Sequence, residues 1–75
     1  MPRLPRVNAR EMVHALRRAG FLEDHQEGSH LALYHPGRKL WVTIPMHPGD
    51  VGVRLTHKIL TQAGLSPDEF RELLR

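Results

Sequence analysis

His30 is the residue of this 75-residue chain whose type and setting could most directly do chemistry. It follows Gly28 and Ser29, and a glycine lets the chain turn tightly before a strand begins. Because an imidazole titrates near neutral pH, His30 could take a proton from a ribose 2′-hydroxyl or give one to a leaving 5′-oxygen. We therefore predict His30 as an acid or base, with Gly28 and Ser29 shaping its turn. The tripeptide alone fits an inert surface histidine better than a catalytic one.

A second group of candidates is cationic and surrounds the segment Pro45–Asp50, which opens into a helix. Free amides at a helix N-terminus attract phosphate, and basic side chains at i, i+3 and i+4 share one helix face. An ordinary solvated face is the alternative. The residues predicted to contact RNA are Arg54, His57, Lys58, Lys39 and His47.

Metal chemistry is disfavoured by the residue types and by their spacing. His25, His30 and His35 are five apart, which alternates strand faces, and neither helix has a histidine pair at i, i+4. The absence of cysteine excludes thiolate nucleophiles and disulfides, and it fits a reducing cytoplasm. We predict no metal and no cofactor. The sequence has no apolar run long enough for a transmembrane span or a signal peptide.

The balance of charge is mildly basic. Eleven Lys and Arg residues oppose eight acidic ones, which gives a formal net charge of +3. A positive balance suits an anionic partner, because phosphate contacts release counterions. A charge of this size is common among small domains, so it does not decide the function.

Three helices are predicted from capping signals and apolar spacing. Asn8 and Glu11 form a capping box before an apolar stripe that ends at Gly20. A second helix runs from residue 51 or 52 to 63 and buries Val53. Within the final segment, residues 66–75, a short third helix spans residues 67–74 after a capping box formed by Ser66 and Glu69.

Between the first two helices the pattern predicts three strands joined by short turns. They span residues 21–26, 30–35 and 40–44, and short connections make the sheet antiparallel. The chain is thus predicted to be one α+β domain over residues 1–75, in the order α-β-β-β-α, like a double-stranded-RNA-binding fold, with an extra C-terminal helix. Residues 1–7 are predicted to be a flexible basic arm.

The sheet should keep one face open, since two helices cover the other. If Leu31 and Leu33 face the core, then His30, Tyr34 and Trp41 share the open face. Exposed aromatic side chains beside basic groups can stack on unpaired bases. The alternative, slightly favoured in so small a domain, is that Trp41 belongs to the core or is covered by the N-terminal arm.

Five segments in order resemble the HicA family of bacterial and archaeal toxins, also called YcfA-like mRNA interferases. They are a first helix ending in Ala19-Gly20-Phe21, then Gly28-Ser29-His30 with a strand ending His35-Pro36-Gly37, Val42–Pro45, His47-Pro48-Gly49, and a helix ending Ile59–Leu65. Together they span roughly residues 8 to 65. Where the family often has a basic residue before the glycine and a polar residue after the histidine, this chain has Glu27 and Leu31.

The resemblance implies a toxin that cleaves mRNA without a metal, with His30 as the catalytic residue. It also implies a HicB-type antitoxin partner that covers the active face. A non-catalytic RNA-binding module of the same fold is the alternative function. It would grip RNA through shape and backbone contacts without cutting it.

Overall fold

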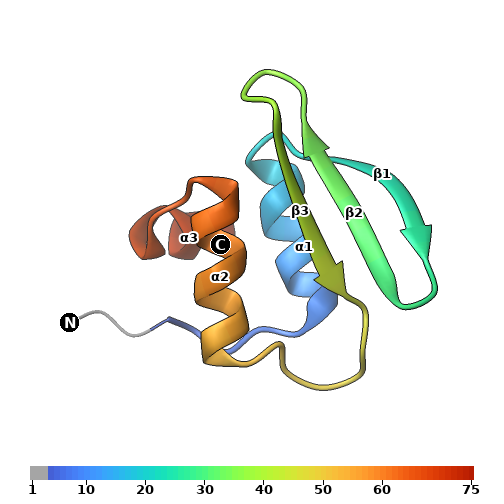
Figure 1. The fold of residues 1–75 in the computed structure, drawn as a ribbon. Helices are drawn as coiled ribbons and strands as arrows, with labels where there is room; N and C mark the ends of the chain where they lie inside the picture. The colour runs from blue at the N-terminus through green and yellow to red at the C-terminus, as the bar shows by residue number, and fades with distance from the viewer. Residues whose placement is uncertain (1–3) are drawn as a thin grey trace.

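The structure, a computed structural model of the chain, describes residues 4–75. The predicted α+β order with an extra C-terminal helix is confirmed (Figure 1). The elements are α1 (Ala9–Arg18), β1 (Leu22–Glu27), β2 (His30–His35), β3 (Leu40–Pro45), α2 (Val53–Ala63) and α3 (Pro67–Leu73).

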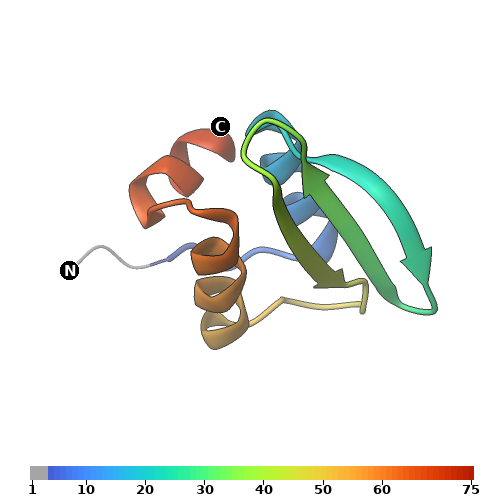
Figure 2. The same ribbon diagram turned by 45° about the horizontal axis from the view of Figure 1, so that its top comes forward.

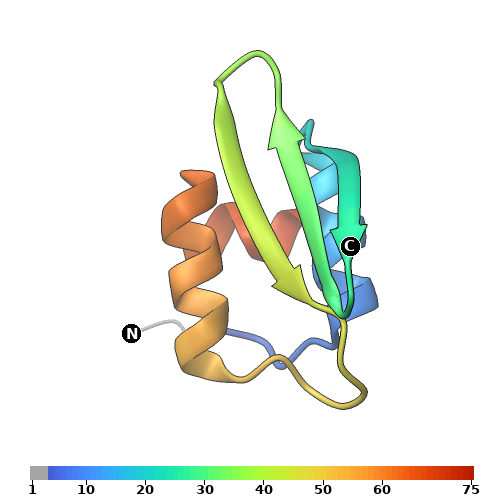
Figure 3. The same ribbon diagram turned by 45° about the vertical axis from the view of Figure 1, so that its right-hand side comes forward.

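The three strands form one antiparallel sheet in the order β1-β2-β3, with β2 in the centre. Leu31 and Leu33 of β2 pair with Ile44 and Val42 of β3, and all four side chains are buried on one face. Figures 1 and 2 show α1 behind this sheet, and Figure 3 shows α2 alongside β3. Because side chains alternate along a strand, the residues between these four lie on the open face.

The structure departs from the prediction in one strand boundary and in the burial of one residue. Phe21, predicted as the first strand residue, precedes β1 and is buried in the core. Val53, predicted as buried, is half exposed because it is the first residue of α2. Thr56 is buried instead, and its hydroxyl donates a hydrogen bond to the Gly52 carbonyl oxygen at 2.7 Å.

The N-terminal segment packs on the domain from Leu4 onward, which corrects the prediction of a flexible arm for residues 4–7. Leu4 and Val7 are buried in the same core cluster as the helices. The Val7 carbonyl oxygen also accepts a hydrogen bond from the Val51 amide at 2.8 Å. Residues 1–3 of the predicted arm lie outside the described residues.

The first helix begins and ends as its sequence signals predict. The Asn8 side chain accepts the Glu11 amide at 2.8 Å, and the Glu11 carboxylate accepts the Asn8 amide at 3.0 Å, which completes the capping box. After the helix, Gly20 has φ +105° and the Phe21 amide bonds to the Leu16 carbonyl oxygen. This left-handed turn directs Phe21 into the core.

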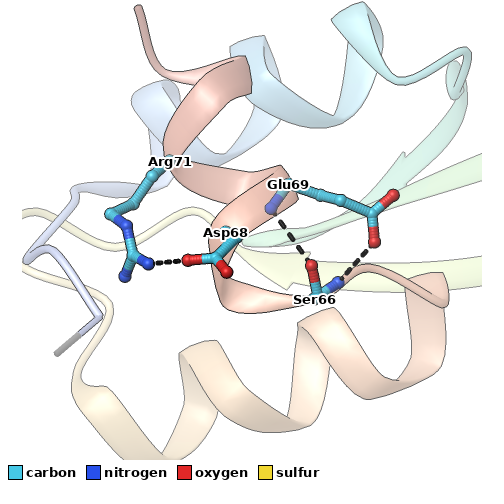
Figure 4. Close-up of polar contacts among 4 residues, drawn as sticks. All are labelled: Ser66, Asp68, Glu69 and Arg71. Atoms are coloured by element: carbon cyan, nitrogen blue, oxygen red, sulfur yellow. Dashed lines mark hydrogen bonds and ion pairs between the residues drawn. The ribbon is translucent and has the colours of Figure 1, made fainter. Parts of the chain in front are cut away.

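The last helix is held by a second capping box, between Ser66 and Glu69 (Figure 4). The Ser66 amide donates a hydrogen bond to the Glu69 carboxylate at 2.9 Å. This bond and the nearby Ser66 side chain lower the pKa of the Glu69 carboxyl, with a smaller contribution from the charge of Arg38. An ion pair between Asp68 and Arg71 lies on the same helix. Phe70 is fully buried, so α3 adds a side chain to the core.

The position of Gly20 against His35 gives a test of the packing. A Cβ on Gly20 would lie 2.7 Å from His35 Nε2, and this ring is fixed by Phe21, at 5.2 Å between centroids, and by the Arg38 amide on its Nδ1. Gly49 has a similar φ of +90° but nothing within 4 Å of its Cβ position.

We therefore expect Gly49→Ala to lower the free energy of unfolding by roughly 1–2 kcal/mol, from backbone strain alone. Gly20→Ala should lose a further 1–3 kcal/mol or so, from overpacking against His35. Urea unfolding of both variants measures the difference, and equal losses would contradict this packing.

Candidate active site

His30 lies at the first position of β2, directly after a two-residue hairpin turn formed by Gly28 and Ser29. Gly28 has φ +57°, a conformation that tight hairpin turns need and that glycine adopts without strain. The Ser29 carbonyl oxygen accepts the Met46 amide, which ties the turn to the segment after β3. The turn predicted from Gly28-Ser29-His30 is therefore present and anchored on both sides.

The imidazole of His30 is exposed on the open face of the sheet. Within residues 4–75 its ring nitrogens have no hydrogen-bond partner. A ring without internal partners can offer either nitrogen to a ligand, as a donor or as an acceptor. His30 thus has the accessibility that proton transfer to or from a bound molecule requires.

A second exposed imidazole, that of His47, lies beside the first. The ring centroids of His30 and His47 are 6.3 Å apart, with an interplanar angle of 81°. His47 comes from the loop after β3, so the sheet and the loop together bring the two histidines to one place. The sequence predicted His30 and His47 as two separate candidates, and the structure places their rings next to each other.

A groove of about 380 Å³ separates this end of the sheet from α2. Lys58 brings a cation to it from α2, the helix that lies alongside β3 (Figure 3). The groove-lining residues are His30, Thr43, Pro45, Leu55, Lys58, Ile59 and Gln62.

The predicted cationic residues do not all gather at this groove. Lys58 lines it, whereas Arg54 and His57 are exposed on α2 and are not among the residues that line it. Lys39 lies in the loop between β2 and β3, at the opposite end of the sheet from His30. Strand geometry places that end roughly 17 Å away.

Sequence reasoning missed the two other polar residues of the groove, Gln62 and Thr43. Gln62 lies four positions after Lys58, so helical spacing could have placed both on one face. Thr43 alternates with the buried Val42 and Ile44, which assigns it to the open face. Neither residue type is distinctive, and only the position of α2 beside β3 brings them to the groove.

The two departures from the family pattern have different places in the structure. Leu31 is buried in the core and so lies on the face of the sheet away from His30. Glu27 is exposed and pairs directly with His30 across the hairpin. Residues so paired have Cβ atoms about 5 Å apart, which brings a negative charge close to the candidate site.

The favoured interpretation of Trp41, as a core residue or one covered by the arm, is wrong. Trp41 is 52% exposed on the open face. Its ring centroid lies 4.6 Å from that of Tyr34, with an interplanar angle of 36°. Val42 and Ile44 of β3 point into the core. Because side chains alternate along a strand, Trp41 must point to the opposite, open face.

A larger hollow, about 600 Å³, lies elsewhere, between α1 and β1. Its basic side chains are partly engaged within the protein. Arg17 forms an ion pair with Glu23 at 3.3 Å, and Arg18 donates a hydrogen bond to the Leu73 carbonyl oxygen at 2.8 Å. Across residues 4–75, no three His, Asp or Glu side chains converge in an arrangement that could hold a metal ion.

Comparison with protein families decides the relationship. Residues 9–65 match the family described as the HicA toxin of bacterial toxin–antitoxin systems. The chain belongs to the HicA toxin family. The matched range includes His30, His47 and Lys58, and α3 follows it. No curated protein matches the chain.

Membership in the HicA family makes this chain a toxin of a toxin–antitoxin system, which implies a cognate antitoxin as its partner. The open face that bears His30 is available for such contacts, since α1 packs against the other face and α2 lies alongside the β3 edge. None of the described helices has the length and apolar character that crossing a membrane requires.

Proposed function

We propose that this HicA-family toxin is a metal-independent endoribonuclease that cleaves mRNA, with His30 as a general acid or base. The observation that supports the proposal most is the setting of His30. Its imidazole is exposed, has no hydrogen-bond partner within residues 4–75, and borders a groove that also contains Lys58. His47 lies alongside.

The proposed reaction needs proton transfer and charge stabilisation only. The ribose 2′-oxygen attacks the adjacent phosphorus while a base removes its proton, and the 5′-oxygen leaves as a proton is returned to it. The products are a 2′,3′-cyclic phosphate and a 5′-hydroxyl. His30 would perform one of the two transfers, a contribution typically worth 10²- to 10⁴-fold in rate.

The surrounding residues would position the RNA rather than react with it. Gly28 and Ser29 hold His30 at the end of the hairpin. Lys58 would neutralise the phosphate in the groove, and His47 would contact it from the other side. Arg54 and His57, exposed on α2, would contact the phosphate backbone of the RNA where it lies outside the groove.

The proposed partners are mRNA as the substrate and a HicB-type antitoxin as the inhibitor. An antitoxin that covers the open face would block access to His30 without changing the fold. The alternative function is an RNA-binding module that does not cut. One observation speaks against cleavage at His30, which is that Glu27 places a negative charge opposite it.

We expect His30→Ala to reduce cleavage of mRNA by 10²- to 10⁴-fold and to abolish growth arrest. Its thermal unfolding should be unchanged, because the side chain is exposed. His14→Ala is the matched control, since His14 is an exposed histidine on α1. Cleavage is measured on labelled RNA in excess chelator.

Full activity of His30→Ala would remove His30 from the mechanism. Cleavage by the wild-type protein that stops in chelator would contradict metal independence. Binding of RNA by the wild-type protein without any fragments would support the binding module instead.

The charge of Glu27 gives a further prediction. Glu27→Gln should tighten the binding of RNA to the uncleaving His30→Ala protein by roughly 2- to 5-fold, because an exposed charge interaction is weak. Glu23→Gln changes the net charge equally, but Glu23 lies on the other face of β1, paired with Leu33. Fluorescence anisotropy measures both, and equal gains would show a general charge effect rather than a site at His30.

A further inference from the structure

A row of apolar and aromatic side chains, with its two outer members exposed and Tyr34 between them half-buried, crosses the open face at the end of the sheet opposite His30. Leu22 of β1 pairs with Tyr34 of β2, which pairs with Trp41 of β3, so the three side chains lie next to one another. Leu22 is 58% exposed and Trp41 52%. Exposed apolar residues that form a contiguous group indicate a binding surface.

The composition of this row favours planar ligands. Tyr34 and Trp41 form a tilted aromatic pair with their ring centroids 4.6 Å apart. Trp41 is the only tryptophan of the chain, and it lies outside the hydrophobic core. Every nucleobase has a flat face that can stack on such rings, whatever the sequence.

We propose that the Tyr34–Trp41 pair is a stacking platform for an unpaired base of the RNA that reaches His30. The inference rests on the proposed function and narrows its substrate to single-stranded RNA. Bases inside an A-form duplex are stacked on one another, and side chains recognise RNA sequence mainly where bases are unpaired.

The spacing of the platform from His30 suits one strand that contacts both. His30 and Tyr34 lie on the same face of β2, four residues and thus roughly 13 Å apart. About four nucleotides of stacked strand, at 3.4 Å each, cover that distance. On β2 and β3, the open-face side chains between the two sites are those of Ala32 and Thr43. Both are small, so they would not obstruct an RNA strand that runs along these two β-strands.

Charge at the far end of the path also favours RNA. Lys39 is exposed in the loop two residues before Trp41 and has φ +54°. It lies too far from His30 to hold the phosphate that is cut, but a strand stacked on Trp41 would bring a phosphate to this end. RNA bound at the Tyr34–Trp41 pair would therefore reach Lys39, whereas RNA bound only in the groove would not.

Trp41 reports on its own site, because the fluorescence of the chain's single tryptophan should be quenched by a stacked base. The titration uses the uncleaving His30→Ala protein and a short single-stranded RNA, with the same RNA in a duplex for comparison. We expect quenching by the single strand and little by the duplex. Equal quenching by both, or none by either, would overturn the platform.

Substitutions at the row separate stacking from other contacts. In the same His30→Ala protein, Trp41→Ala should weaken binding of the single strand roughly 10-fold, and Trp41→Phe should stay within about 2-fold, since one base stack is retained. Leu22→Ala is the matched control, as exposed as Trp41 but unable to stack. Thermal unfolding of each variant checks the fold.

Loss of RNA affinity in Leu22→Ala equal to that in Trp41→Ala would show a general apolar contact and overturn the proposal. Unchanged RNA affinity in Trp41→Ala would also overturn the proposal. This holds even if Trp41→Ala weakens the binding of a protein partner. The nuclease proposal is judged separately: if the wild-type protein cuts no RNA while a single strand quenches Trp41, the nuclease fails and the platform stands.

Discussion

The alternation of side chains along β2 is the constraint on which the candidate site depends. Leu31 and Leu33 belong to the small core, and their burial fixes which face of the central strand points inward. A slip of one residue in the pairing would turn every side chain of the strand to the other face. The position of His30 and Tyr34 on the open face therefore follows from the packing of the leucines between them.

Local signals made most of the fold predictable from the sequence. The capping boxes at Asn8 and Ser66 depend on residues three apart, and both form as predicted. The errors concern segments whose burial depends on the whole domain. Leu4 and Val53 have similar apolar side chains, but the first is covered by the core and the second projects from the start of α2.

The candidate site was less predictable, because its parts come from separate elements. The turn before His30 could be predicted from adjacent residues, but the nearness of His47 depends on how the loop after β3 returns to the sheet. Lys58 lines the groove because α2 lies beside β3. The distance of Lys39 from His30 follows from the antiparallel pairing of β2 and β3, which residue type and charge do not show.

An exposed acid–base group suits a domain of this size, since only part of the surface of so short a chain can be buried. If His30 transfers a proton to or from the 2′-hydroxyl or the 5′-oxygen of RNA, the ends that the wild-type protein leaves on its RNA products will show it. We expect 2′,3′-cyclic phosphate and 5′-hydroxyl ends, with no cut at a linkage whose 2′-hydroxyl is replaced by hydrogen. Products with 5′-phosphate ends, or cleavage at that linkage, would contradict it.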